Sequence, residues 1–225
     1  MTGDEILIDL SHVIENGMTT FAGLPGPHIC DYWTRAASAE KYDDGSSFQI
    51  GRIDMVANTG TYLDSPYHRY SDGRDLSELP LSTVADLEGV CLRAHNLSGR
   101  GVDLSVFREV DLAGKAVLVH TGWDVHWGRE RYFKGHPFLT TEAARFLVDA
   151  GARLVGIDSY NIDDTKDFSR PVHSILLRAN IPVVEHLCNL NALPASGFRF
   201  FAVPVKVKNF GTFPVRAFGI IQKQQ

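Results

Sequence analysis

Asn58-Thr-Gly-Thr-Tyr-Leu-Asp-Ser-Pro-Tyr-His68 is the stretch around which this 225-residue chain is organised, since it gathers amide, phenol, carboxylate and imidazole groups around a turn. Gly60 permits a close backbone approach, and Pro66 restricts the backbone two residues before His68. Asp64 and His68 are therefore expected on a stiffened segment. Such stiffness is what a preorganised chemical site requires.

The flanks of this stretch place it next to a strand. An apolar run with strand-like spacing lies between Phe48 and Met55. The polar loop Ser71-Asp-Gly-Arg-Asp75 follows the stretch and ends near Pro80. We therefore expect the stretch at the mouth of a strand.

The same stretch resembles the His-x-Gly-Thr-His-x-Asp-x-Pro-x-His signature of the cyclase family of metal-dependent hydrolases, which includes bacterial kynurenine formamidase and isatin hydrolase. Asn58 and Tyr62 stand where the signature has imidazole ligands. The resemblance thus indicates a divergent member that lacks two signature histidines. The positions that match are Gly60, Thr61, Asp64, Pro66 and His68.

Outside the signature, short apolar runs alternate with an amphipathic pattern that is typical of α/β proteins. Thr141 is the predicted cap of the first long helix, and Gly151 is predicted to end it. Pro171 opens a second helix. The predicted strands are 6–10, 89–95, 116–120, 154–158 and 181–185, and the predicted helices are 141–150 and 171–178.

The C-terminal part alternates apolar and other residues over 198–207 and 213–221, which predicts two strands joined by a turn at 209–211. Family resemblance implies an α/β fold with a mixed β-sheet curled into a barrel-like core and flanking helices. We expect residues 1–225 to form a single domain of this kind. The resemblance also implies a homodimer.

Composition excludes several classes of partner. A net charge of -5 with scattered Lys and Arg provides no electrostatic footprint for nucleic acid or an anionic membrane. No segment has the apolar length of a membrane span, and the start of the chain lacks a signal-peptide pattern, so we expect a cytoplasmic protein. Cys30, Cys91 and Cys188 are widely spaced, which favours free thiols over disulfides or a thiolate zinc site.

Two later residues complete a candidate metal site. His173 lies near a helix start, and Glu185 ends a strand, where open α/β sheets place ligands. The family places one metal on the two signature histidines and the aspartate, and a second on that aspartate with a later histidine and glutamate. In this chain, the resemblance implies that the second set is retained as Asp64, His173 and Glu185. Asn58 could add a neutral oxygen ligand. Two carboxylates and one imidazole favour one divalent ion, zinc or manganese, and the lost imidazoles leave open whether it binds.

Further residues are candidates for contact with a small-molecule substrate. Phe21 resembles the early-loop aromatic residue that packs on substrate in the family. Trp123 belongs to a segment, 121–128, that resembles the family's Thr-Gly-Trp…Trp-Gly segment. Core packing is the alternative role for both side chains. The polar loop 158–164 resembles the loop that borders the family's pocket, with a solvated turn as the alternative.

Three functions remain open. In the first, His68 transfers protons while a metal activates water to hydrolyse an amide, lactam or lactone. In the second, no metal binds, Tyr62 donates to an oxyanion or enolate, and His68 works with Asp64 or Glu185 in a cyclase, dehydratase or isomerase. In the third, the chain is an inactive module that binds a small molecule or protein. Convergence of the candidate residues in one accessible pocket would favour an enzyme.

Overall fold

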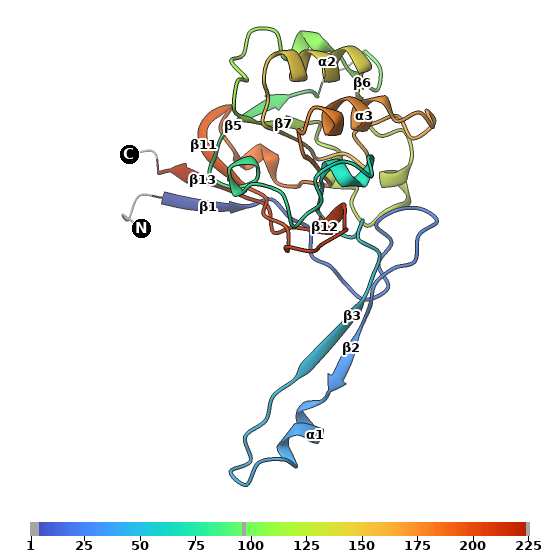
Figure 1. Ribbon diagram of the computed structural model, residues 1–225, viewed down its shortest axis with the longest axis vertical. Coiled ribbons are helices and arrows are strands. Elements are labelled where there is room, and N and C mark those ends of the chain that lie inside the picture. Colours follow the sequence, from blue (N-terminus) through green and yellow to red (C-terminus); the bar gives the residue numbers. More distant parts are fainter. Residues whose placement is uncertain (1–4, 96–97, 224–225) are drawn as a thin grey trace.

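A mixed nine-stranded sheet forms the centre of the computed structural model, which describes residues 5–95 and 98–223 (Figure 1). The strands β5, β7, β9 and β10 are parallel neighbours, and all other pairs are antiparallel. The sheet curls into a half-barrel, which confirms the expected architecture. Its order is β1 (Glu5–Asp9), β13 (Phe218–Gln222), β11 (Ser196–Phe201), β5 (Leu87–Arg93), β7 (Ala116–His120), β9 (Leu154–Ile157), β10 (Val183–Glu185), β4 (Tyr62–Asp64) and β12 (Thr212–Pro214).

Two helices, α2 (Thr141–Asp149) and α3 (Pro171–Arg178), pack together above the parallel strands (Figure 1). Apolar side chains of both helices belong to one core cluster with Val117 and Val119 of β7 and Val155 and Ile157 of β9. The alternate residues Ala116, Leu118 and Leu154 of the same strands belong to a second core cluster. The cap of α2 is Thr140, one residue before the prediction, since its hydroxyl accepts from the Ala143 amide at 3.2 Å. Among the described residues, no helix has the length and apolar character that crossing a membrane requires.

Short elements complete the connections between the strands and helices. The two-residue strands β6 (Gly101–Val102) and β8 (Phe138–Leu139) form a small parallel pair beside α2. Single 3₁₀ turns lie at Pro66–His68, Leu81–Thr83, Leu104–Val106, Trp123–His126, Glu130–Phe133 and Leu190–Ala192.

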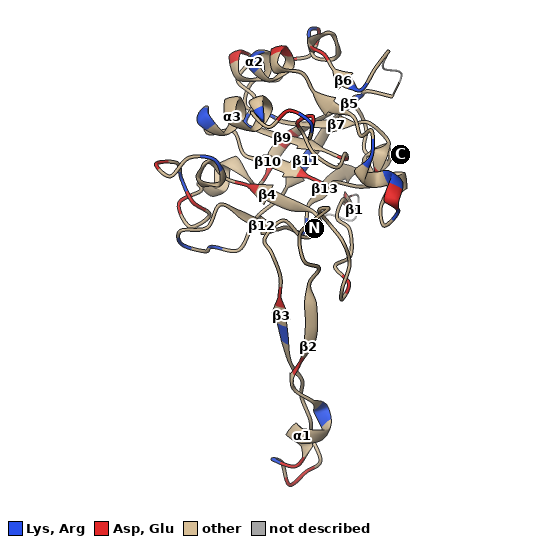
Figure 2. Ribbon diagram, turned by 90° about the vertical axis from the view of Figure 1, so that its right-hand side faces the viewer, with Lys and Arg blue, Asp and Glu red and all other residues tan. Residues whose placement is uncertain are grey.

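A two-stranded arm projects from the body and carries the short helix α1 (Arg35–Ala39) at its far end (Figures 1 and 2). It consists of β2 (His28–Trp33) and β3 (Ile50–Asp54), which pair antiparallel. The predicted strand before the signature is therefore present as β3. It pairs within the arm, however, and every residue of β3 is exposed.

The two C-terminal strands predicted at 198–207 and 213–221 pair as β11 and β13, but no tight turn at 209–211 joins them directly. Residues 213–221 divide between β12 and β13, which pair with strands far apart in the sheet. β12 pairs with β4, and β13 lies between β1 and β11. The antiparallel pairing of the two predicted strands is thus present, but the direct turn is wrong, because alternation identifies extended backbone without showing that β12 leaves to pair with β4. As a result, β12 pairs with the edge of β4 that does not face β10.

Candidate active site

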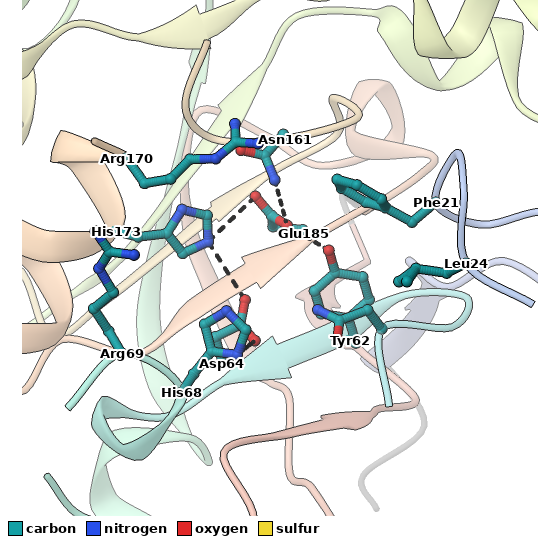
Figure 3. Close-up of a pocket in the computed structure, with 11 residues that line it drawn as sticks. Phe21, Leu24, Tyr62, Asp64, His68, Arg69, Asn161, Arg170, His173 and Glu185 are labelled. Carbon is teal, nitrogen blue, oxygen red and sulfur yellow. Dashed lines mark hydrogen bonds and ion pairs between the residues drawn. The ribbon is translucent and has the colours of Figure 1, made fainter. Parts of the chain in front are cut away.

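One cavity of about 200 Å³ brings together side chains from distant parts of the chain (Figure 3). The signature contributes residues from β4 and the 3₁₀ turn after it, α3 contributes His173, and β10 contributes Glu185. Every catalytic or metal residue predicted from the sequence lines this cavity. The lining residues are Phe21, Leu24, Asn58, Tyr62, Asp64, His68, Arg69, Asn161, Arg170, His173 and Glu185.

Strand register explains why the signature faces Glu185. β4 and β10 are antiparallel, and Tyr62 lies directly opposite Glu185. Directly opposed residues project from the same face of a sheet, so both side chains reach the cavity. Gly60 supplies the turn before β4 with a φ of 68°, and a Cβ there would lie 2.8 Å from Ile14 Cγ1. The glycine of the signature is thus required by its conformation and by close packing.

His173 lies between two carboxylates. Its Nε2 atom is 3.5 Å from Asp64 Oδ2 and 3.6 Å from Glu185 Oε1 (Figure 3). Its Nδ1 atom is 2.6 Å from Asp163 Oδ2. Burial by itself lowers the pKa of His173, but Glu185, Asp163 and Asp64 together raise this pKa to about 10. The imidazole therefore lies in a strongly negative environment that favours positive charge at this position.

The two carboxylates differ in how their oxygens are engaged. Glu185 accepts from the Ile162 amide at 2.6 Å, from the Tyr62 hydroxyl at 2.5 Å and from Asn161 at 3.3 Å. Burial raises the pKa of Glu185. Burial also acts to raise the pKa of Asp64, but the neighbouring imidazoles outweigh it and lower this pKa. Asp64 Oδ2 is buried and has no hydrogen-bond partner among the described residues.

The two residues that replace signature histidines have different surroundings. Tyr62 is fully buried, and burial raises its pKa well above the usual value, so its hydroxyl is a neutral donor to Glu185. Asn58 also lines the cavity. A phenol and a carboxamide thus occupy the region in which the signature has two imidazoles.

His68 lies at the accessible side of the cavity, with 35% of its side chain exposed. Its Nδ1 atom is 2.7 Å from Thr212 Oγ1 and 3.4 Å from Asp64 Oδ1. The partial exposure lets His68 exchange protons with water, while the neighbouring groups hold one edge of its ring.

The two residues predicted to contact substrate differ in whether they line the cavity. Phe21 lines the cavity and packs 4.9 Å from the ring of Tyr160. Trp123 is not among the lining residues, and its contacts are those of packing, the alternative role that the sequence left open. Its indole N–H donates to the Tyr132 carbonyl at 3.0 Å, and Arg131 lies 5.0 Å from its ring centre. These contacts hold the indole away from the cavity.

Several site residues were missed by sequence reasoning. Asp163 and Asn161 belong to the polar loop 158–164, so composition pointed to their segment without assigning either contact. Thr212 carried no signal, since it lies in an ordinary strand pattern 144 residues after His68. Leu24, Arg69 and Arg170 line the cavity from loops and helix ends, where periodicity is uninformative.

Curated relatives match nearly the whole chain. Kynurenine formamidase from Geobacillus thermodenitrificans is 27% identical over 212 residues, which cover 93% of this chain and 95% of the relative. Kynurenine formamidase from Salinibacter ruber is 29% identical over 214 residues, with coverage of 94% and 95%. The expectation of an enzyme of the hydrolase class agrees with these names.

Solved structures share the fold. An isatin hydrolase bound to the product analogue thioisatinate superposes with a TM-score of 0.84 at 21% identity, covering 99% of this chain and 94% of that chain. Isatin hydrolase A from Labrenzia aggregata superposes with a TM-score of 0.82 at 21% identity, with coverage of 99% and 96%. The family model described as "Putative cyclase" matches residues 8–164, which is more than half of the chain. The chain therefore belongs to the cyclase family.

Proposed function

We propose that this protein is a metal-dependent hydrolase that cleaves the carbon–nitrogen bond of a small amide or lactam, or the corresponding ester bond of a lactone. The observation that carries the proposal is the convergence of His68, Asp64, His173 and Glu185 in one cavity, where a buried Asp64 oxygen has no hydrogen-bond partner among the described residues. Family membership and the names of the relatives support the same class of reaction.

The residues present fit one divalent cation. Within the described chain, Asp64 Oδ2 accepts no hydrogen bond, and His173 Nε2 lies within 3.6 Å of an oxygen of each carboxylate. Because Asp163 accepts the Nδ1 proton of His173, Nε2 is the ring nitrogen left to bind a metal, which would take the place of a proton there. Asp64, His173 and Glu185 would hold the ion, with Asn58 close enough to the cavity to add a neutral oxygen. This ligand set suits zinc or manganese.

A bound ion would polarise the substrate carbonyl and make water more acidic. His68 takes a proton from the attacking water and returns it to the departing nitrogen or oxygen. One water is consumed: its hydroxyl makes the acyl carbon a carboxylic acid, and its proton goes to the nitrogen or oxygen of the broken bond, which stays on the same molecule when a lactam or lactone is opened. The partial exposure of His68 allows its proton to equilibrate with solvent between cycles.

The rim of the cavity favours substrates that carry or acquire negative charge. Arg69 and Arg170 both line it. Their guanidinium groups are held by backbone carbonyls, with Arg69 donating to Ser169 at 2.7 Å and Arg170 to Asp164 at 3.2 Å. Guanidinium groups suit carboxylates. Together with Phe21, they support a small substrate with an aromatic or apolar part and a carboxylate that is present or formed by hydrolysis.

The metal-independent alternative requires Tyr62 to donate its hydroxyl proton to the substrate. That proton is engaged by Glu185 at 2.5 Å, which supports hydrolysis over the metal-independent isomerase or dehydratase. In the proposed site, Tyr62 therefore positions Glu185. The inactive module is disfavoured because the polar side chains face an accessible cavity rather than apolar core.

Elemental analysis of protein purified without chelator tests the metal, and a panel of amides, lactams and lactones tests the reaction. We expect about one equivalent of zinc or manganese and hydrolysis of at least one panel member. His68→Ala should lower kcat on the order of 10²-fold or more without loss of metal. Metal content below about a tenth of an equivalent with activity retained would reject the metal role. Unchanged turnover in His68→Ala would remove His68 from the mechanism.

We also propose that the working unit is a homodimer joined through the arm. The arm exposes apolar side chains, among them the directly opposed Ile29 and Ile53. An uncovered two-stranded ribbon is only marginally stable in water. The mainly acidic tip, residues 40–44, complements the segment 203–210, in which exposed valines alternate with Lys206 and Lys208. Both surfaces are exposed within one chain, so contact between two copies would cover each.

A further inference from the structure

Thr212 joins the proposed proton-transfer residue to a proposed metal ligand. Its hydroxyl oxygen is 2.7 Å from His68 Nδ1 and also hydrogen-bonds to Asp64 Oδ1. Thr212 is only 3% exposed, so these two groups are its principal partners in place of water. The residue does not line the cavity, and it acts from behind the two side chains that do.

The strand β12 holds Thr212 in this place. Thr212 lies directly opposite Asp64 in the antiparallel pair of β12 and β4, so both side chains project from one face. The Gly211 carbonyl accepts from the Ser65 amide at 2.7 Å, which ties the start of β12 to the signature turn. The position of the hydroxyl is therefore set by backbone pairing as well as by its own hydrogen bonds.

The direction of the hydrogen bonds follows from the number of available protons. A hydroxyl has one proton to donate, and an ionised carboxylate can only accept. The Thr212 hydroxyl therefore donates to Asp64 Oδ1, since the carboxylate cannot donate, whereas the His68 ring nitrogen can either donate or accept. The Thr212 oxygen must then accept from His68, which requires a proton on His68 Nδ1.

We propose that Thr212 is a positioning residue that fixes the tautomer of His68. With the proton held on Nδ1, the neutral imidazole presents the unprotonated Nε2 atom as the proton acceptor. The same hydroxyl engages Oδ1 of Asp64 and leaves Oδ2 for a cation. This assignment deepens the proposed hydrolytic function and rests on it, since it concerns the state of its acid–base residue.

The tautomer determines whether His68 can begin the reaction. An imidazole protonated on Nε2 would present a donor to the attacking water and could not take its proton. Without the Thr212 hydroxyl, Nδ1 would face Asp64 Oδ1 at 3.4 Å, a distance too long for a well-formed hydrogen bond. Neither tautomer of His68 would then be strongly favoured, and some of the molecules would carry the proton on Nε2 instead of Nδ1.

The test compares Thr212→Val, which keeps the shape and removes the hydroxyl, with Thr212→Ser, which retains it. Thr83→Val is the matched control, because Thr83 is equally buried and donates to the Pro80 carbonyl at 2.7 Å far from the cavity. The ¹⁵N resonances of neutral imidazoles report which ring nitrogen carries the proton. The chain has nine histidines, so the His68 resonances must be assigned. They are the resonances that are absent from the spectrum of His68→Gln.

We expect the wild-type and Thr212→Ser proteins to hold the His68 proton on Nδ1, and Thr212→Val to shift population toward Nε2. In a substrate assay, Thr212→Val should lower kcat about 10- to 100-fold with KM changed less than about threefold, and Thr212→Ser should restore most of the rate. Thr83→Val should change neither the tautomer nor kcat.

A wild-type His68 protonated mainly on Nε2 would overturn the proposal, as would an unchanged tautomer in Thr212→Val. The wild-type spectrum gives this answer even if Thr212→Val does not fold. The NMR measurement needs neither substrate nor turnover, so it stands apart from the hydrolytic function. Failure of the substrate panel would reject the reaction and leave the tautomer result intact.

Discussion

Single residues behind the cavity determine what the residues facing it can do. Asp163 accepts from the His173 imidazole at 2.6 Å and also from the backbone amides of Val172 and His173, at 2.7 and 3.1 Å. It therefore orients the imidazole and anchors the start of α3 in one arrangement. An imidazole held in this way presents a fixed lone pair to a metal, which is why such supporting carboxylates strongly affect affinity.

Asp163→Asn should weaken metal binding about 10- to 100-fold. The amide group of asparagine can donate to His173 Nδ1, which would move the imidazole proton to Nε2 and block the proposed ligand atom. Competition with a chromogenic chelator measures the change in affinity. Asp164→Asn is the neighbouring control, because Asp164 pairs instead with Arg100 at 2.7 Å. Equal metal affinity in both variants would contradict the role of Asp163.

Among the structural elements, β4 connects the site to the rest of the sheet. It is only three residues long, and it pairs with β10 on one side and with β12 on the other. These two neighbours supply Glu185 and Thr212, respectively. Because the two strands come from different parts of the chain, the site is assembled only when both edges of β4 are paired.

Gly211→Ala should destabilise the protein and lower activity. A Cβ at this position would lie 2.5 Å from both the backbone nitrogen and Cα of His68, and backbone atoms cannot move aside cheaply. β12 must then shift away from the signature turn, at a cost of roughly 1–3 kcal/mol in the free energy of unfolding. Urea denaturation measures this cost.

Gly99→Ala is the control for this substitution, because nothing lies within 4 Å of its added Cβ. Its unfolding midpoint should remain close to that of the wild type. If Gly211→Ala had the same midpoint and activity as Gly99→Ala, the close approach of β12 to His68 would not be needed for the site.

At the scale of the whole molecule, the arm projects from the body, and its apolar side chains are exposed in a single chain. Its base is continuous with the cavity, since Phe21 and Leu24 precede β2 and Asn58 follows β3. A second copy that packs on the arm would therefore also restrain the loops that carry these lining residues. A two-fold arrangement would repeat the arm contact in both copies and close the assembly at two chains.

Ile53→Asp should convert the proposed dimer to a folded monomer, because it places a charge at the exposed Ile29–Ile53 pair of the arm. Sedimentation velocity measures the mass, and circular dichroism confirms the fold. Arg52→Ala is the matched control, since Arg52 belongs to the opposite face and pairs with Cys30. A wild-type protein that sediments as a monomer at micromolar concentration would contradict the proposed interface.

A charge reversal tests the partner surface. The double change Lys206→Glu and Lys208→Glu should weaken association by repelling the acidic tip of the arm. Combining it with Asp43→Lys and Asp44→Lys should restore the dimer, because the two surfaces again carry opposite charges. Restoration would assign the contact to these two segments, and continued dissociation would place the interface elsewhere.

Local sequence patterns were sufficient to predict secondary-structure elements and to identify the family. The bounds of β7 and α3 agree with prediction, because apolar periodicity and an opening proline act over a few residues. The signature identified the family through its matching positions and located two of the site residues, Asp64 and His68. The family pattern also extended to His173 and Glu185, which meet those residues in the cavity.

Partnerships between distant segments depended on the folded chain. No periodicity indicated that β12 would pair with β4, that Thr212 would bridge His68 and Asp64, or that β3 would leave the main sheet. Trp123 was likewise placed by the Tyr132 carbonyl, which its own segment does not reveal. A strand's alternation fixes which of its residues share a face, but its partner is chosen by the total burial and hydrogen bonding of the whole sheet. Chemistry that arises between such partners is therefore a property of the three-dimensional fold.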